Sequence, residues 1–400
     1  MFAVKAGNAF DGERQLPGGA VIFVDGGRIV GAAPAAAPLP DGCAVTEFPG
    51  ATMLPGLIDT HVHLGGDGRD GALDRLTDYR ADELAEVIDT ALRSHLAAGV
   101  TTVRDLGDRR WSVLERRDRA NDDAADVAIP TILASGPPIT SIRGHCWQMG
   151  GEAQGAAALR ATIRERAERR VDVVKIMSSG GVTTAGTDLM ACQFSHDDVR
   201  LLVDEAHAAG LPVTVHAHGL AAIEQAIEAG VDGIEHCACL TPSGMDMRDS
   251  LLESLAQRRI AVCPTVGTAP DAIPSPAELA FFQRLNLTRE SVLTAVGRLH
   301  RAGVRVTAGT DGGIAATRPH GIVHAAISVL VASGVPAPEA LASATSIAAQ
   351  VCGLGASKGR LRAGYDADLL LVDGNPLSDV RALTNIATVM VNGRWADIAS

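Results

Sequence analysis

Short apolar runs alternate with longer stretches of helical spacing through the middle of the chain. Each run ends in a polar residue or a glycine, a helical stretch follows, and the pattern then returns. This pattern predicts strands at Gly56–His63, Thr101–Asp105, Thr131–Ser135, Val171–Ile176, Val213–His218, Gly233–His236, Ala261–Val266 and Val304–Asp311. Eight strand-helix units predict an α/β fold, the closed (β/α)₈ or TIM barrel, because parallel neighbours need a crossover. A doubly wound open sheet is the competing interpretation, which the lack of a Gly-x-Gly-x-x-Gly motif after the early strands disfavours.

Helices are expected between these strands. Ala81–Ala98 carries apolar residues near helical spacing, and Ala153–Arg170 is rich in alanine and arginine. Ser195 is a capping residue followed by acidic residues, which suit the positive end of a helix. The last helices are expected within Leu341–Leu354.

The two ends of the chain share another pattern, short strands broken by glycine. Strands are predicted at Ala20–Val24 and Arg28–Val30 across an Asp-Gly-Gly turn, and again at Asp368–Asp373 and Ala387–Val391. Ala32–Pro40 is rich in alanine and proline and is interpreted as a loop. We expect residues 1–54 and 357–400 to form one small β-sandwich domain, since open sheet edges are a liability, and residues 55–356 to form the barrel.

Composition narrows the class of protein. The chain has 400 residues, 46% of them apolar, so it is globular. Only 3% are aromatic and the net charge is −12, so we expect neither nucleic acid nor membrane as partner. The partner we expect is a small-molecule substrate, and a homo-oligomer is left open. Seven scattered cysteines and no signal-peptide pattern predict reduced thiols and a cytoplasmic location.

Two histidines, His61 and His63, stand at the end of an apolar run. Residues two apart in a strand point to the same face, so both imidazoles project together. Neutral imidazole is the commonest protein ligand for zinc and similar metals. Further candidates close other predicted strands: Lys175, His216, His236 and Asp311. Because the carboxyl ends of barrel strands converge on one mouth, these residues predict a metal site there.

An ordered set of motifs carries a resemblance that covers essentially the whole chain. They are Pro55-Gly56-Leu57-Ile58-Asp59-Thr60-His61-Val62-His63, Gly144-His145-Cys146-Trp147-Gln148-Met149-Gly150-Gly151-Glu152, Val174-Lys175, Val215-His216-Ala217-His218-Gly219, Ile234-Glu235-His236, Gly309-Thr310-Asp311 and Ala367-Asp368-Leu369 with Gly374-Asn375-Pro376. In these motifs the chain resembles the amidohydrolase superfamily, in the subgroup similar to imidazolonepropionase and the Xaa-Pro dipeptidases (prolidases).

The resemblance implies a binuclear metal site, most often with two zinc ions. His61 and His63 would bind the more buried ion, shared with Asp311, and His216 and His236 would bind the second.

Lys175 would bear a carbon dioxide adduct and bridge both ions, because a carbamate presents two oxygens where an amine is a poor bridge. The two ions would supply a coordinated water of lowered pKa as the source of the nucleophile.

The resemblance also implies roles around the metals. Asp311 would carry the proton from the nucleophile to the leaving nitrogen, and His145 would donate a hydrogen bond to the developing oxyanion. Arg143 and Arg318 are candidates for holding a substrate carboxylate, because guanidinium matches a carboxylate fork. His218 faces the same way as its metal-binding neighbour and is assigned to substrate or to a local hydrogen bond.

In two places the chain departs from the family's pattern. His218 stands where many relatives have tyrosine, and Ala325-Ala326 stand where many have an acidic residue. Dipeptide specificity therefore does not follow from the resemblance, whereas hydrolysis does.

The leading hypothesis is a metal-dependent hydrolase that cleaves the amide bond of an N-acyl amino acid or dipeptide with a free carboxylate. A cyclic amide or imidazolone, a carbamate or urea-type bond, or an ester remain alternatives within the superfamily. Two other classes are an inactive barrel scaffold, which the complete ligand set disfavours, and a one-metal deaminase. Relatives that are deaminases lack the bridging lysine, so the presence of Lys175 disfavours the deaminase alternative.

Overall fold

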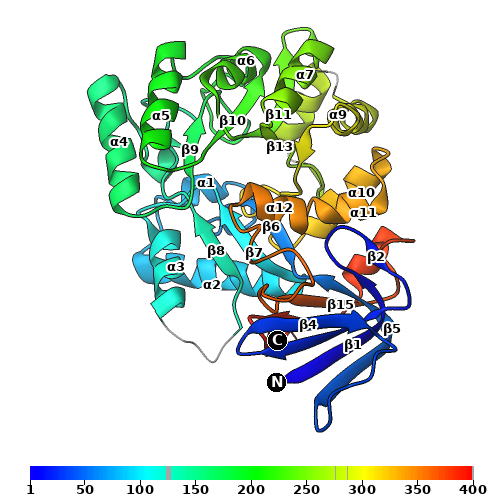
Figure 1. Ribbon diagram of the computed structural model, residues 1–400. Coiled ribbons are helices and arrows are strands. Elements are labelled where there is room, and N and C mark those ends of the chain that lie inside the picture. Colours follow the sequence, from blue (N-terminus) through cyan, green and yellow to red (C-terminus); the bar gives the residue numbers. More distant parts are fainter. Residues whose placement is uncertain (123–127, 275, 286, 399–400) are drawn as a thin grey trace.

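The computed structural model describes residues 1–122, 128–274, 276–285 and 287–398, and has the mixed α/β character that the sequence predicts (Figure 1). Each of the eight predicted barrel strands overlaps a strand among these residues. The strands are β6 (Leu57–Val62), β7 (Val100–Asp105), β8 (Thr131–Ala134), β9 (Val174–Met177), β10 (Val213–Gly219), β11 (Gly233–Thr241), β13 (Ala261–Cys263) and β14 (Arg305–Val306). The predicted alternation of strands and helices is therefore confirmed.

These strands form two sheets in which neighbouring barrel strands run parallel, and two isolated bridges link the sheets. One has the order β6-β7-β8, and the other has the order β14-β13-β11-β10-β9, with the short β12 (Gly244–Met245) paired to β11. A parallel bridge between Val62 and Gly312 joins β6 to the segment after β14, and a second between Ile139 and Ile176 joins the segment after β8 to β9. The arrangement is TIM-barrel-like, and it brings the carboxyl ends of the strands together.

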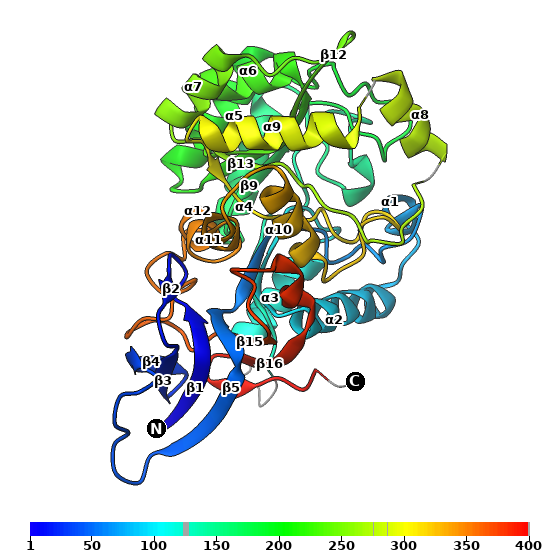
Figure 2. The same cartoon turned by 90° about the vertical axis from the view of Figure 1, so that its right-hand side faces the viewer.

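Helices connect consecutive strands and cover the sheets (Figures 1 and 2). They are α1 (Ala72–Arg75), α2 (Ala81–Ala97), α3 (Ser112–Asp122), α4 (Ala156–Glu168), α5 (His196–Ala208), α6 (Leu220–Ala229), α7 (Asp249–Gln257), α8 (Pro276–Arg284), α9 (Arg289–Arg301), α10 (Val323–Ala332), α11 (Ala337–Ala342) and α12 (Ser346–Val351), with 3₁₀ turns at Trp147–Met149 and Val380–Thr384. Ser195 caps α5 as expected, because its side chain accepts a hydrogen bond from the Asp198 backbone amide.

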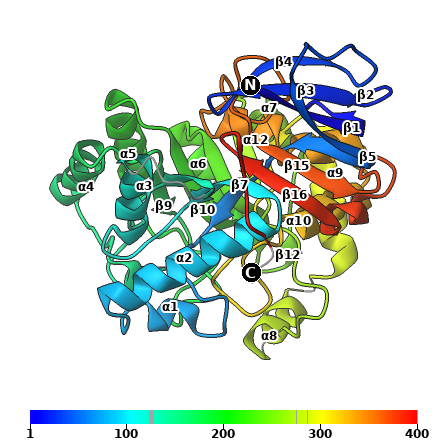
Figure 3. The same ribbon diagram turned by 90° about the horizontal axis from the view of Figure 1, so that it is seen from below.

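Both ends of the chain contribute to one further sheet, which Figure 3 shows beside the barrel helices. Its order is β17-β16-β15-β5-β1-β3-β4, and β2 pairs with β1. The strands are β1 (Phe2–Phe10), β2 (Gln15–Leu16), β3 (Ala20–Asp25), β4 (Arg28–Pro34), β5 (Ala44–Pro55), β15 (Leu369–Asp373), β16 (Ile386–Val391) and β17 (Arg394–Trp395). The loop predicted at Ala32–Pro40 is wrong at its start, because β4 continues to Pro34 by pairing with β3.

The two faces of this sheet bury different residues. Val4, Ile22 and Leu371 pack in a cluster on one face, whereas Leu54 and Leu370 join the large core around the barrel strands. This alternation is that of a sheet covered on both sides. A separate β-sandwich domain with limits at residues 54/55 and 356/357 stays a prediction.

One buried lysine ties the segment after the last helix to this sheet. Lys358 Nζ lies 2.9 Å from Asp366 and 2.6 Å from Asp368, and its side chain is only 5% exposed. Burial alone lowers the pKa of Lys358, but the two carboxylates outweigh it and the pKa is raised. No helix within the described ranges has both the length and the apolar character that crossing a membrane requires.

Candidate metal centre

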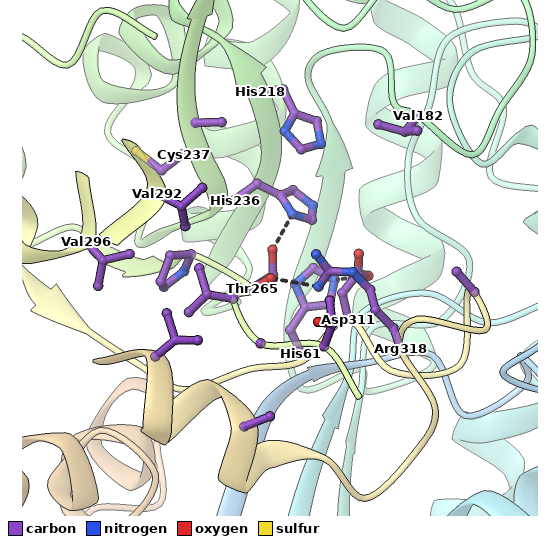
Figure 4. Close-up of a pocket in the computed structure, with 18 of the residues that line it drawn as sticks. His61, Val182, His218, His236, Cys237, Thr265, Val292, Val296, Asp311 and Arg318 are labelled. Carbon is purple, nitrogen blue, oxygen red and sulfur yellow. Dashed lines mark hydrogen bonds and ion pairs between the residues drawn. The ribbon is translucent and has the colours of Figure 1, made fainter. Parts of the chain in front are cut away.

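The six predicted ligands line one cavity of about 880 Å³ at the carboxyl ends of the strands. Figure 4 shows part of this cavity. Of the four residues predicted to contact substrate, His145, His218 and Arg318 line it as well. The strand ends thus converge as the barrel pattern predicts.

The first group of ligands comes from the end of β6, the residue that follows it, and the segment after β14. His61 Nε2 and His63 Nε2 both lie 3.3 Å from Asp311 Oδ1. The Asp311 backbone amide donates to His61 O at 2.8 Å, and its φ of 58° lies in the left-handed region, so the backbone turns sharply here. Burial alone would raise the pKa of Asp311, but the two histidines and the Arg318 guanidinium outweigh it and hold the pKa well below its usual range. Asp311 is therefore an ionised carboxylate facing two imidazoles.

The second group comes from β10 and β11. A ligand atom from each of His216, His218 and His236 lies within 4.8 Å of the other two. The ring centroids are 4.5 Å apart for His216 and His236, and 4.7 Å for His216 and His218. Burial is the largest cause of the lowered pKa of all three, so the rings are neutral and each has a nitrogen lone pair.

Lys175 belongs to β9, beside β10, and is 1% exposed. Burial lowers its pKa, although the charges of Glu235 and Asp311 oppose this. Burial is the largest cause of the lowered pKa of His61 and His216, one from each ligand group, and Lys175 is a smaller electrostatic cause in both. A buried lysine near both groups, with its pKa lowered, favours the neutral amine.

The histidines are oriented as metal ligands usually are. The bonds of their other ring nitrogens are His61 Nδ1 to Glu235 Oε2 (2.8 Å), His63 Nδ1 to Gly107 O (3.1 Å), His216 Nε2 to Gly180 O (3.0 Å) and His236 Nδ1 to Thr265 Oγ1 (2.7 Å). A carbonyl or ionised carboxylate can only accept, so the ring nitrogens of His61, His63 and His216 donate and their opposite nitrogens keep a lone pair; the Thr265 hydroxyl can either donate to His236 or accept from it. Metal-binding histidines typically have such second partners, and this donor set therefore fits divalent metal ions.

Glu235 is a buried residue to which the sequence analysis gave no role. Its Oε1 accepts from Arg104 Nη2 at 3.1 Å and from Thr214 Oγ1 at 2.6 Å, while Oε2 accepts from His61. Burial alone raises the pKa of Glu235, but Arg104 and His61 lower it further than burial raises it. An acidic residue inside an apolar strand, directly before His236, is the signal that could have revealed it.

Asp59 is a second residue without a predicted role. It accepts from Thr310 Oγ1 at 2.7 Å and from the Thr310 amide at 3.1 Å. These bonds tie β6 to the residue before Asp311, so they fix Asp311 opposite the two histidines.

His145 is buried beside the second group. Its ring lies 4.5 Å from that of His216, and its Nδ1 lies 2.9 Å from Thr184 Oγ1. Burial, with a smaller electrostatic contribution from neighbouring His218, lowers the pKa of His145 to about 3, so its ring is neutral and has one N–H to donate. A side chain at Gly181 would lie 2.2 Å from its ring, so the glycine is needed for this close approach.

The two candidate arginines have different surroundings. Arg318 Nη1 donates to Thr265 O at 2.7 Å and to Thr310 O at 2.8 Å, which fixes its guanidinium at the cavity (Figure 4). Arg143 is exposed, lies 3.7 Å above the Trp147 ring and is not among the residues that line the cavity. The structure therefore brings Arg318, and not Arg143, to the predicted ligands.

Apolar side chains form much of the remaining cavity wall. They include Leu240, Met245, Met247, Val292, Val296 and Ile314. An apolar wall with a few fixed polar groups is typical of small-molecule sites.

A sequence profile of the amidohydrolase family matches residues 52–396, most of the chain and every predicted ligand. The chain belongs to the amidohydrolase family. The superfamily inferred from the motifs is confirmed, and its members include the relatives and structures that follow.

Two other amidohydrolases are similar to this chain in sequence. Ochratoxinase of Aspergillus niger is 27% identical, and the match covers 82% of this chain and 72% of ochratoxinase. Imidazolonepropionase of Caulobacter vibrioides is 28% identical, with 88% and 87% covered. Among solved structures, a Xaa-Pro dipeptidase with methionine bound in its active site has a TM-score of 0.83 and 26% identity, over 99% of both chains.

Proposed function

We propose that this amidohydrolase cleaves the amide bond of an N-acyl amino acid or a dipeptide with a free carboxylate, in a metal-dependent reaction. The observation that supports this proposal is the cavity itself, in which two groups of metal-ligating side chains face one space with a buried lysine. The similarity to a Xaa-Pro dipeptidase structure agrees with it. The proposal includes closure of the eight strands into one (β/α)₈ barrel.

Two divalent ions, zinc by preference, would be held by the predicted ligands. His61, His63 and Asp311 would bind the first, and His216 and His236 the second. Bound ions of this kind lower the pKa of a coordinated water towards neutrality and polarise a carbonyl group.

Lys175 would bridge the two ions as a carbamate. Burial favours its neutral amine, and only the neutral amine has the lone pair that adds to carbon dioxide with loss of a proton. The product is an anion with two oxygens, which suits a position between two cations.

The residues of the chain would move the proton and stabilise the new charge. Asp311 is ionised and faces the cavity, so it can take a proton from the attacking water and deliver it to the leaving nitrogen. His145 is neutral and buried, so its N–H can donate to the oxyanion in surroundings of low polarity.

Arg318 would hold the substrate's carboxylate. Its Nη1 is engaged by two backbone carbonyls, which orients the remaining N–H groups without neutralising the charge. A carboxylate is the partner that matches this planar donor set.

A second candidate is hydrolysis of a cyclic amide, in particular an imidazolone. The similarity to imidazolonepropionase over 88% of the chain favours it. A cyclic substrate without a carboxylate would not need Arg318, which separates the two candidates.

The test is a hydrolysis screen with the zinc-loaded protein in bicarbonate. N-acyl amino acids and dipeptides form the panel, each paired with its carboxamide, and the released amine is measured. We expect turnover of the free acids, weaker turnover of the amides, and a raised KM in Arg318→Met for the acids alone. Turnover of imidazolones without any turnover of the panel would overturn the dipeptide proposal in favour of the second candidate.

A further inference from the structure

The motif His216-Ala217-His218 on β10 repeats the pattern of His61-Val62-His63, which covers the end of β6 and the residue after it. In each case two imidazoles two positions apart point to the same side of a strand end. The pair on β6 is completed by Asp311 from another segment, and the pair on β10 is completed by His236. The cavity therefore holds two groups of three, built in the same way.

His218 lies as close to its group as the two predicted ligands do. Its ring centroid is 4.7 Å from that of His216 and 4.4 Å from that of His236, the shortest of the three separations in this group. Figure 4 shows the His218 and His236 rings one above the other. Rotation about χ2 of a histidine is soft, and one ring nitrogen of His218 already lies within 4.8 Å of a nitrogen from each of the other two rings.

His218 Nδ1 is a buried nitrogen without a hydrogen-bond partner among the described residues. The other two histidines differ, because one ring nitrogen of His216 bonds to Gly180 O and one ring nitrogen of His236 bonds to Thr265 Oγ1. A buried polar atom without a partner costs free energy, and an unmodified protein rarely retains one without a ligand or ion to satisfy it.

We infer that His218 is a third imidazole ligand of the second divalent ion, so that His216, His218 and His236 hold this ion together. The inference rests on the proposed binuclear centre and replaces the assignment of His218 to substrate. It gives each ion three side chains of its own in addition to the bridge.

The two ligand sets would then differ in charge and in metal preference. The first contains the carboxylate of Asp311, whereas the second contains only neutral nitrogen donors. Three imidazoles suit zinc, cobalt and nickel, while magnesium and manganese prefer oxygen. The second position should therefore select against manganese more strongly than the first.

The first test counts the imidazole rings that bind metal in the unaltered protein. The chain is labelled with nitrogen-15 at histidine and loaded with spin-active cadmium, and ring nitrogens coupled to cadmium are counted by NMR. We expect five coupled rings, those of His61, His63, His216, His218 and His236. Four coupled rings with two bound ions would overturn this inference alone, whereas fewer than two bound ions would overturn the binuclear centre as well.

The second test compares variants for metal retention. His218→Asn and His218→Phe are titrated with a chelator, and zinc per chain is measured by mass spectrometry. Loss of an outer partner weakens metal binding roughly 10- to 100-fold, so loss of a direct ligand should weaken the second ion at least about 100-fold and leave the first in place. His145→Asn is the matched control, because His145 also packs on His216 but belongs to neither ligand group, and it should retain both ions. Retention of both ions by folded His218 variants, with folding checked by circular dichroism, would contradict the inference.

Discussion

Replacement of Glu235 by glutamine tests two roles of this residue. One is its contribution to folding stability inside the barrel, and the other is its contribution to the metal affinity of the site. The carboxylate of Glu235 accepts from Arg104, Thr214 and His61, and its side chain is 1% exposed. Glutamine keeps the size of the side chain and removes its negative charge. The change therefore leaves no cavity, and its effects come from the charge.

Two effects are expected, each with its own magnitude. The Arg104 side chain is 7% exposed and would lose the only carboxylate with which it forms an ion pair among the described residues. Removal of one partner from a buried ion pair costs about 3–5 kcal/mol of folding stability. The same change removes the anionic acceptor that orients His61, and loss of such an outer partner weakens metal binding roughly 10- to 100-fold.

Urea unfolding of the metal-free protein and chelator titration of the zinc-loaded protein measure the two effects separately. The double variant Arg104→Met/Glu235→Gln removes the unpaired charge, so it should recover part of the stability but none of the metal affinity. Thr214→Val is the matched control, because it removes one hydrogen bond to the Glu235 carboxylate, worth about 1.5–3 kcal/mol, and leaves the bond to His61 in place. Unchanged zinc affinity in Glu235→Gln would refute the role of Glu235 in orienting His61.

The pH dependence gives an independent check. The pKa of Glu235 is lowered below its ordinary value of 4.5, so its contribution to stability is complete above that value and is lost as the pH falls through the folded-state pKa. The stability difference between the unaltered protein and Glu235→Gln should therefore shrink on acidification below about pH 4.5. A difference that grows on acidification would contradict the ionised state of Glu235.

Three further changes test other parts of the structure. Asp311→Asn should fold normally, as judged by circular dichroism, and lower kcat by several orders of magnitude, because it loses a metal ligand and the proton carrier; near-normal kcat would refute both roles. Lys175→Ala should lose bound zinc, measured by mass spectrometry, because the bridge is gone; unchanged metal content would contradict the bridge. Lys358→Met should lower the free energy of unfolding by about 3–5 kcal/mol, since Asp366 and Asp368 are left without their buried cation. Because the pKa of Lys358 is raised above 10.5, its contribution is complete below that value and is lost only as the pH rises through the higher folded-state pKa, so the deficit measured by urea unfolding should disappear only in strong alkali.

The strand ends were predictable because their signal is local. An apolar run that ends in histidine, lysine or aspartate gives both the strand and the face of its last residue, and His61, His63 and His216 line the cavity accordingly. The prediction of the last strand was less exact. Val304–Asp311 was expected, whereas β14 covers only Arg305–Val306, because the following residues bond to β6 and to other segments instead of forming a regular ladder.

The contacts that orient the ligands were not predictable from local pattern. Glu235 is separated in sequence by 131 positions from Arg104 and by 174 positions from His61. No periodic pattern along the chain indicates such distant contacts. Arg143 shows the converse, since a loop arginine close to His145 in sequence points to the Trp147 ring instead of the cavity. Spacing indicates which face of a strand a residue occupies, but not where a loop side chain points.

Counting divalent ions per chain tests the central claim most directly. The protein is loaded with zinc in bicarbonate, freed of excess metal by gel filtration, and analysed for zinc by mass spectrometry against an accurate protein concentration. The account predicts two ions per chain in the unaltered protein. One ion or none, in protein shown to be folded, would contradict a binuclear centre at this cavity.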